Sequence, residues 1–251
     1  MRERLYGRNP VYETLRAARR RFYRLWVADG VQVKGSLRAA LRLAGEKGVE
    51  VQRLPRRKLD ALLGHAHHQG VVLEASPYPY ADLDAMLALA AKRGEPPFFL
   101  LLDALQDPQN LATLLRTAEA VGVHGVLLPL RRTATITPAV VNASSGASEH
   151  LLVAQHNLAQ AIDRLQARNV WVVGLEGSAE AGPPEAVSLR GALALVVGSE
   201  GRGLRRLVRQ KCDALLRLPM RGKMESLNAA VAGSVALYLA WQQRGWDGRS
   251  N

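Results

Sequence analysis

One stretch of the sequence places an amide, a guanidinium and helix-start signals close together. Residues 103–125 read DALQDPQNLATLLRTAEAVGVHG. Asp107 is a suitable helix N-cap and the proline after it suits the first helical position, so a helix is predicted to begin there. Asn110 then falls in the first turn, near the carboxyl end of the preceding strand, where α/β sheets bind ligands. Arg116 follows in mid-helix, where this stretch alone favours a surface pair with Glu119.

A second stretch, LALVVGSEGRG at 193–203, is an apolar run that breaks into three glycines. Their spacing, G-x-x-G-x-G, differs from the dinucleotide fingerprint G-x-G-x-x-G, and the G-K-[ST] ending of a P-loop is absent. Glu200 lies within the turn and argues against an anion. The turn therefore suits a ligand that bears hydroxyls or positive charge.

A third stretch, LPMRGKMESLNAAVAGSVALY at 218–238, joins an apolar strand exit to a helix predicted over 226–243. Ser226 is a plausible N-cap and Asn228 lies in the first turn. This helix is apolar nearly all round, which implies burial on more than one side, by its own domain or by a second subunit. Taken alone, the stretch is equally consistent with an ordinary loop that connects a strand to a helix.

The elements that position these stretches follow an α/β order. The chain has 251 residues and is 48% hydrophobic, enough for one or two globular domains. Short strands alternate with helices over 1–76, prolines mark a linker over 77–97, and longer apolar strands follow over 98–251. Their continuous hydrophobicity predicts a parallel sheet covered on both faces.

The positive charge is concentrated at the beginning of the chain. Residues 1–76 hold 16 Lys or Arg and 7 Asp or Glu, a net charge of +9 out of +12 for the whole chain. Arginines gather beside aromatics in RAARRRFYRLW at 16–26. This pattern favours a nucleic-acid partner, with a merely soluble basic surface or a solvated helix end as alternatives.

The cysteine content and the hydropathy of the chain indicate its cellular compartment. Cys212 is the single cysteine, so no internal disulfide forms, and neither a signal core nor a membrane span is evident. We expect a cytoplasmic protein without a membrane or metal partner. The histidines in GHAHHQG at 64–70 have no partner cluster elsewhere and are interpreted as RNA-facing or structural.

In this order, the three stretches resemble the three motifs of the SpoU/TrmH (SPOUT) family of RNA ribose 2′-O-methyltransferases, over residues 98–243. YGRNPVYETLRA and HHQGVVLEA near the N-terminus are similar to the ribosomal-protein-like substrate-binding domain of the 23S rRNA guanosine 2′-O-methyltransferase branch. Ala229 and Ala230 stand where bulkier or hydroxylated residues are common, which bears on packing more than on chemistry.

The resemblance implies a trefoil-knotted α/β methyltransferase domain that binds S-adenosylmethionine in the knot and works as a homodimer, with the site at or near the subunit interface. By position, the cofactor contacts would be Gly198, Leu218 and Leu227, with Met220 nearby. The candidate RNA contacts are Arg8, Arg19, Arg20, Arg21, His68 and Gln69.

The resemblance also implies that Arg116 is catalytic. A guanidinium holds its proton too firmly to be a good general base, so its role stays open between stabilising a forming alkoxide and orienting a substrate phosphate. Asn110, Ser226 and Asn228 match the family's polar residues that hold this arginine and the substrate ribose, and Glu200 is a further candidate.

Three alternatives remain at this point. A nicotinamide-binding Rossmann protein would need an early glycine fingerprint, which follows the first strand of neither domain. A non-catalytic RNA-binding protein would have lost the residues of the three motifs. Within the family, rRNA is preferred to tRNA as substrate because of the N-terminal domain.

Overall fold

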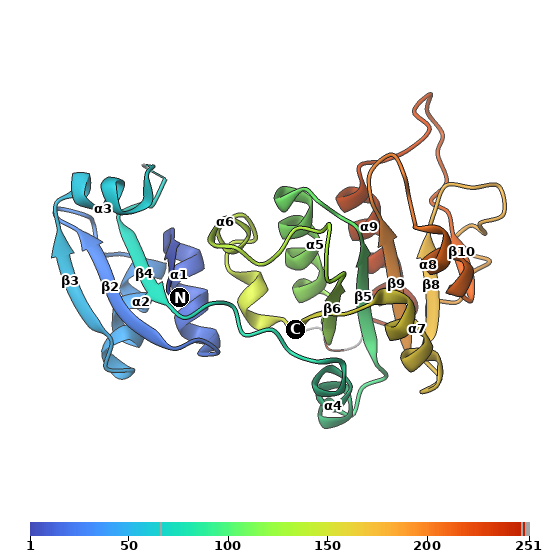
Figure 1. The fold of residues 1–251 in the computed structure, drawn as a ribbon, viewed down its shortest axis with the longest axis horizontal. Coiled ribbons are helices and arrows are strands. Elements are labelled where there is room, and N and C mark those ends of the chain that lie inside the picture. Colours follow the sequence, from blue (N-terminus) through green and yellow to red (C-terminus); the bar gives the residue numbers. More distant parts are fainter. Residues whose placement is uncertain (66, 247, 249–251) are drawn as a thin grey trace. The chain divides into compact units, whose positions relative to one another are not determined.

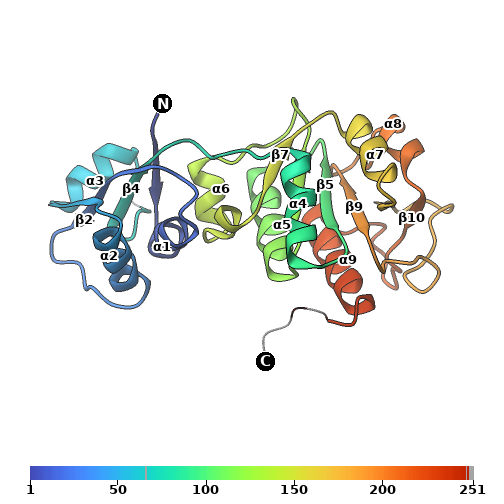
Figure 2. The same cartoon turned by 90° about the horizontal axis from the view of Figure 1, so that it is seen from below.

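The computed structural model describes residues 1–65, 67–246 and 248, and its contacts divide the chain into two compact units. The first unit comprises Met1–Pro79 and Ile136–His150, and the second comprises Tyr80–Thr135 and Leu151–Asn251. Figures 1 and 2 show the chain from two sides. Each unit has a sheet and a hydrophobic cluster of its own.

The first unit contains a mixed sheet in the order β1-β4-β2-β3. Strand β2 pairs in parallel with β3 and antiparallel with β4, which pairs antiparallel with β1. The elements are β1 (Glu3–Tyr6), α1 (Arg8–Ala17), β2 (Phe22–Ala28), α2 (Ser36–Glu46), β3 (Glu50–Leu54), α3 (Arg56–Leu63), β4 (Val71–Ala75), α6 (Pro138–Ala143) and the 3-10 helix η1 (Ala147–His150).

Alternation along β2 gives this sheet two buried faces. Trp26 and Ala28 point to one face, where they pack with Leu59 of α3. Leu25 and Val27, on the opposite face, are also buried. The alternation of short strands with helices that the sequence predicts for this part of the chain is confirmed.

One segment does not follow the predicted division of the chain, in which all residues from 98 onward belong to the second domain. Ile136–His150 packs in the first unit, with α6 against β1 and η1 against α1. Asn142 Nδ2 donates to the Tyr6 carbonyl over 3.1 Å, and His150 Nε2 lies 2.7 Å from Glu13 Oε2. These polar contacts carry no sequence periodicity, so the pattern of apolar residues did not reveal them.

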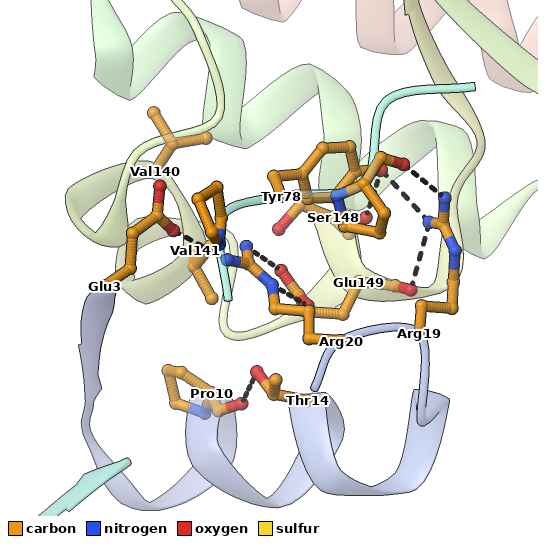
Figure 3. A network of polar contacts seen from close by, with 12 residues as sticks. Glu3, Pro10, Thr14, Arg19, Arg20, Tyr78, Val140, Val141, Ser148 and Glu149 are labelled. Atoms are coloured by element: carbon orange, nitrogen blue, oxygen red, sulfur yellow. Dashed lines mark hydrogen bonds and ion pairs between the residues drawn. The ribbon is translucent and has the colours of Figure 1, made fainter. Parts of the chain in front are cut away.

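A buried ion network holds this segment in place (Figure 3). Arg20 donates from Nε and Nη2 to the two carboxylate oxygens of Glu149, each over 2.8 Å, and from Nη1 to Glu3 Oε2 over 2.6 Å. The Arg20 side chain has no exposed surface, and Glu149 has 1%. Burial disfavours the charged guanidinium, but the hydrogen bonds and charges of Glu149 and Glu3 outweigh it and raise the pKa of Arg20.

Arg19 and Tyr78 extend the same network. Arg19 donates to the Tyr78 hydroxyl over 3.1 Å and to the Pro79 and Glu149 carbonyls, and the Tyr78 hydroxyl donates to the Ser148 carbonyl. Burial raises the pKa of Tyr78 to about 12, so its hydroxyl stays protonated near neutral pH.

The structure therefore corrects part of the predicted RNA-contacting set. The prediction of Arg20 as an RNA contact is wrong because its side chain is buried in an ion network. Arg19 is half-buried, and its guanidinium is engaged inside the unit. His68 is also wrong: its side chain is fully buried, its Nδ1 accepts from Gly70 N over 2.9 Å, and Nε2 therefore donates to Asp60. These three side chains stabilise the fold.

The other predicted RNA contacts lie nearer the surface. Arg21 and Gln69 are exposed, and Arg8 is half-buried. Gln69 accepts from Arg8 N through Oε1 over 3.0 Å and from Arg8 Nε through its carbonyl over 3.2 Å. The Arg21 guanidinium lies 5.5 Å from the centre of the Tyr23 ring.

The second unit is a parallel sheet in the order β10-β8-β9-β5-β6-β7. The prediction of a parallel sheet in an α/β fold is confirmed, whereas the trefoil knot stays a prediction. The elements are α4 (Leu83–Arg93), β5 (Phe98–Asp103), α5 (Pro108–Ala120), β6 (Gly125–Leu128), β7 (Val153–Gln155), α7 (Leu158–Gln166), β8 (Trp171–Leu175), β9 (Leu193–Gly198), α8 (Arg206–Lys211), β10 (Ala214–Leu216) and α9 (Ala229–Gln243).

Helices cover both faces of this sheet (Figure 2). On one face, apolar residues of α4, α7 and α8 form a continuous cluster with the sheet, including Met86 and Ile162. On the other face, α5 packs beside α9, and Gly233 of α9 lies against Leu114 and Val197. Helix α4, within the predicted linker, is thus part of this core. Among the described residues, no helix meets the length and hydropathy needed to cross a membrane.

We expect the buried ion network to dominate the stability of the first unit. Glu149→Ala should lower its free energy of unfolding by about 3–5 kcal/mol, because it breaks a buried ion pair and leaves Arg20 Nε and Nη2 without an acceptor. Glu50→Ala, which breaks the exposed pair of Arg24 and Glu50, should cost less than about 1 kcal/mol. Urea unfolding followed by circular dichroism compares the two, with hydrogen exchange to locate the loss. Equal losses of stability in the two variants would contradict the dominant role of the buried ion network.

Candidate active site

Helix α5 places Asn110 at the carboxyl edge of the parallel sheet. Asp107 caps the helix by accepting from Gln109 N over 2.9 Å, and Pro108 occupies the first turn, as predicted. Asp103, the last residue of β5, pairs in register with Gly198, the last residue of β9. The connections that follow these two neighbouring strands therefore start side by side.

The glycine turn after β9 is held by close backbone packing. Ser199 and Gly203 exchange backbone hydrogen bonds of 2.9 and 3.1 Å across the turn. A Cβ on Gly198 would lie 2.3 Å from the carbonyl carbon of Gly203 and 2.6 Å from Leu204 N, so a larger residue does not fit. Glycine is required at this position because the returning backbone touches it.

Asp103 fixes the far end of the same turn. Its side chain is fully buried and accepts from Arg205 N over 2.7 Å and from Arg205 Nε over 2.6 Å. The sequence analysis did not select this residue, although a carboxylate that ends a buried apolar strand is a recognisable signal. Both ends of the turn are thus anchored to the end of the sheet.

The N-cap of helix α9 lies two residues later than predicted. Asn228, not Ser226, is the N-cap: Asn228 Oδ1 accepts from Ala230 N over 3.0 Å and from Val231 N over 3.2 Å. The prediction of Ser226 as the cap was wrong because both residue types cap helices and only the backbone geometry distinguishes them.

Three of the predicted site residues meet at one oxygen. Asn110 Nδ2 donates to Glu200 Oε1 over 2.7 Å, and Asn228 Nδ2 donates to the same oxygen. Asn228 Nδ2 also donates to Asn110 Oδ1 over 3.1 Å. We call these three side chains the amide–carboxylate triangle. It joins α5, the glycine turn and the start of α9, the three motifs of the sequence analysis.

A cavity of about 460 Å³ lies beside the triangle. Its lining includes the predicted cofactor contacts Gly198, Leu218, Met220 and Leu227, together with Ser226. Glu200 and Asn228 reach it. Sequence reasoning missed Glu225, whose carboxylate adds negative charge, and Glu176, whose carboxylate is paired with Arg209 over 2.8 Å. The cavity thus combines apolar walls, tight backbone and acidic groups, which suits an organic ligand with positive charge.

Arg116 does not belong to this lining. It is exposed on α5, and six positions after Asn110 the two side chains point about 120° apart around the helix. Its neighbour Thr117 contacts Ser234 of α9, with the two hydroxyl oxygens 2.8 Å apart. Thr117, seven positions after Asn110, lies on nearly the same side of α5 as Asn110, so Arg116 points away from the face that α5 shares with α9.

A parallel sheet with its ligand cavity at the carboxyl ends of the strands defines an α/β protein that binds a small organic ligand. The model of the SpoU rRNA Methylase family matches residues 97–238, and that of RNA 2'-O ribose methyltransferase substrate binding matches residues 4–81. The chain belongs to the SpoU rRNA methylase family. It is an RNA ribose 2′-O-methyltransferase, and the resemblance drawn from the motifs is confirmed.

Individual relatives cover nearly the whole chain. A putative TrmH family tRNA/rRNA methyltransferase, YacO of Bacillus subtilis, is 44% identical over 95% of this chain and 94% of its own length. The 23S rRNA (guanosine-2'-O-)-methyltransferase RlmB of Pseudomonas syringae is 41% identical, with 96% of both chains covered. The SpoU methyltransferase AviRb of Streptomyces viridochromogenes, solved with AdoMet, shares the fold: TM-score 0.78, 23% identity, 96% and 90% covered.

The packing at Gly198 gives a direct test of the cavity as a binding site. Gly198→Ala should displace the glycine turn and weaken the binding of S-adenosylmethionine, the ligand that the sequence resemblance implies, about tenfold or more, since overpacking costs about 1–3 kcal/mol. Gly177→Ala is the matched control, because Gly177 also lines the cavity but has open space around it. Calorimetry measures both. Unchanged binding by the Gly198 variant would place the ligand elsewhere.

Proposed function

We propose that this enzyme uses S-adenosylmethionine to methylate a guanosine ribose in 23S rRNA. The amide–carboxylate triangle beside the cavity is the observation that carries the proposal, because it assembles the three family motifs around one candidate ligand site. RlmB of Pseudomonas syringae is named for this reaction, and the substrate-binding match at residues 4–81 supports a structured RNA.

The residues present fit the cofactor. A volume of about 460 Å³ is in the range of small-molecule sites, and Leu218 and Leu227 offer apolar walls. The carboxylate of Glu225 suits a cationic ligand, and the close-packed backbone at Gly198 suits a planar group. When bound, the cofactor would supply a methyl group activated by a sulfonium centre. AviRb, solved with AdoMet, has the same fold.

The protein's own residues have separate tasks in this proposal. Asn110 and Asn228 are held by Glu200, so their amides are fixed in direction before a substrate arrives. Ser226, exposed at the cavity, is placed to contact the ribose. Arg116 stabilises the charge on the 2′-oxygen or holds an adjoining phosphate, because a guanidinium does not give up its proton at neutral pH.

The position of Arg116 supports a site completed by a second copy of the chain. Helix α9 exposes Val231, Val235 and Tyr238 at 48%, 42% and 45%, spaced along one face. A groove of about 340 Å³ along this helix is also lined by Leu239 and Trp246. Covering this apolar face with the same face of a partner gives a homodimer, and α5 with its Arg116 packs beside that helix.

The substrate assignment predicts where the methyl group goes. Labelled S-adenosylmethionine offered with unmodified 23S rRNA, 16S rRNA and tRNA in parallel should label 23S rRNA, at the ribose of one guanosine. Mapping the modified ribose identifies the position. Label in tRNA alone would show that the substrate is tRNA and not 23S rRNA. Label in none of the three RNAs would overturn the proposed activity.

Arg116→Ala should keep cofactor binding and lose methyl transfer by about a hundredfold or more, the scale seen when one stabilising donor is removed. Thr113→Ala is the control, since Thr113 is exposed one turn earlier on the same helix. Calorimetry and methyl transfer are measured on both proteins. A variant that still methylates near the wild-type rate would exclude Arg116 from catalysis.

The dimer has an independent test. Val235→Glu should give a monomer in light scattering, because a carboxylate would have to be buried against an apolar partner. Leu207→Glu, at an exposed leucine on α8, should leave the dimer intact. A wild-type protein that is monomeric at assay concentration would contradict the proposed dimer. The same molecular mass in light scattering for the Val235→Glu and Leu207→Glu variants would contradict it as well.

A further inference from the structure

The RNA-binding surface of the first unit has to be sought away from Arg19, Arg20 and His68, whose side chains are engaged inside it. Many of the unit's other cations are exposed, but they differ in whether a carboxylate neutralises them. Their distribution over the two ends of the sheet is uneven.

The register of the sheet brings four connections to one end. Tyr6 pairs with Val72 and Ala28 with Leu54, so the end of β1, the ends of β2 and β3, and the start of β4 lie together. Asp29 N donates to the Leu54 carbonyl and Ala28 N to the Gly70 carbonyl, each over 2.9 Å. We call this end of the sheet the loop edge.

The loop edge carries a compact cationic cluster. Arg53, Arg56, Arg57 and Lys58 lie within six consecutive residues, where β3 turns into α3. All four are exposed, and among the described residues none forms an ion pair with a carboxylate. The first turn of α3 contains no acidic residue. Cations near a helix N-terminus repel the positive end of its dipole, so an external polyanion relieves an unfavourable arrangement.

Further groups at this edge suit a nucleic acid. Lys34, in the connection after β2, is exposed and has no ion pair among the described residues. The rings of Tyr6 and His65 meet edge to face with their centres 4.6 Å apart, and His67 follows at 5.7 Å from His65. Aromatic groups at the same end of a sheet as exposed cations suit the stacking of an unpaired base.

The carboxylates at the loop edge do not cancel this charge. Asp60 accepts from the buried His68, and Asp29 is exposed and forms no ion pair among the described residues. The far end of the sheet is different. There, Arg2 pairs with Glu74 and Arg24 with Glu50, each over 2.8 Å. Arg21 and Lys47 at the far end also form no ion pair among the described residues, but the larger group of unneutralised cations lies at the loop edge.

We propose that the loop edge is the RNA-binding surface of this unit: Arg53, Arg56, Arg57, Lys58 and Lys34 hold phosphates, and an unpaired base stacks on Tyr6 and His65. The chemistry selects a folded RNA in which a loop or bulge adjoins a paired stem. The inference rests on the proposed function and names the surface through which the substrate is held.

Two variants with the same loss of charge test the cationic cluster. The first replaces Arg53, Arg56, Arg57 and Lys58 by Gln. The control replaces Arg2, Arg24, Arg42 and Lys47 by Gln. Three of these are exposed and Arg24 is half-buried, and the first three are ion-paired. The first variant should bind a 23S rRNA fragment at least about tenfold more weakly, and its slope of log K against log salt should fall by about three. The control should stay within about threefold of the wild type.

Cofactor affinity separates this proposal from the function on which it rests. Both variants should bind S-adenosylmethionine like the wild type, and the cluster variant should show a raised KM for RNA with kcat little changed. Equal RNA binding by the two variants would overturn the loop edge as the binding surface. A wild-type protein that methylates no RNA would instead overturn the proposed function.

The stacking component has its own measurement. His65→Ala should weaken binding to an RNA hairpin with an unpaired loop about tenfold and leave binding to a fully paired duplex of equal nucleotide number unchanged. An equal loss with both RNAs, or none with either, would remove the base-stacking role of Tyr6 and His65.

Discussion

One carboxylate oxygen, Glu200 Oε1, holds together the connections around the cavity. The amides of Asn110 and Asn228 both donate to it, and these residues belong to helices that follow different strands. In a parallel sheet, all such connections emerge at the same end, so this topology brings the three residues of the triangle together. Asn228 caps α9 at the same time, because its oxygen faces the helix and its nitrogen faces the triangle. The start of α9 and the glycine turn are therefore coupled.

Burial separates the arginines that stabilise the first unit from those that can reach a ligand. Arg20 and Arg53 are indistinguishable by type, yet the first meets Glu149, 129 positions away in the chain, and the second meets solvent. Local composition shows that positive charge is concentrated in this part of the chain. It does not show which guanidinium has a distant carboxylate, and that partner decides whether a cation is structural or free to bind phosphate.

The sequence predicted the elements whose signals are local. The continuous apolar strands of the second unit and the cap at Asp107 are where the pattern placed them, because burial on both faces and capping act over a few residues. The placement of Ile136–His150 in the first unit depends on the distant Arg20, and the need for glycine at Gly198 depends on the returning Gly203. These features require a three-dimensional contact, which no short window of sequence contains.

The placement of Ile136–His150 makes the first unit discontinuous in sequence. The chain passes between the units after Pro79, after Thr135 and after His150, so the first unit is not attached by a single linker. Glu149 fixes the inserted segment in the core of the first unit. The buried ion network thus builds the first unit from two stretches of the sequence that are separated by more than fifty residues.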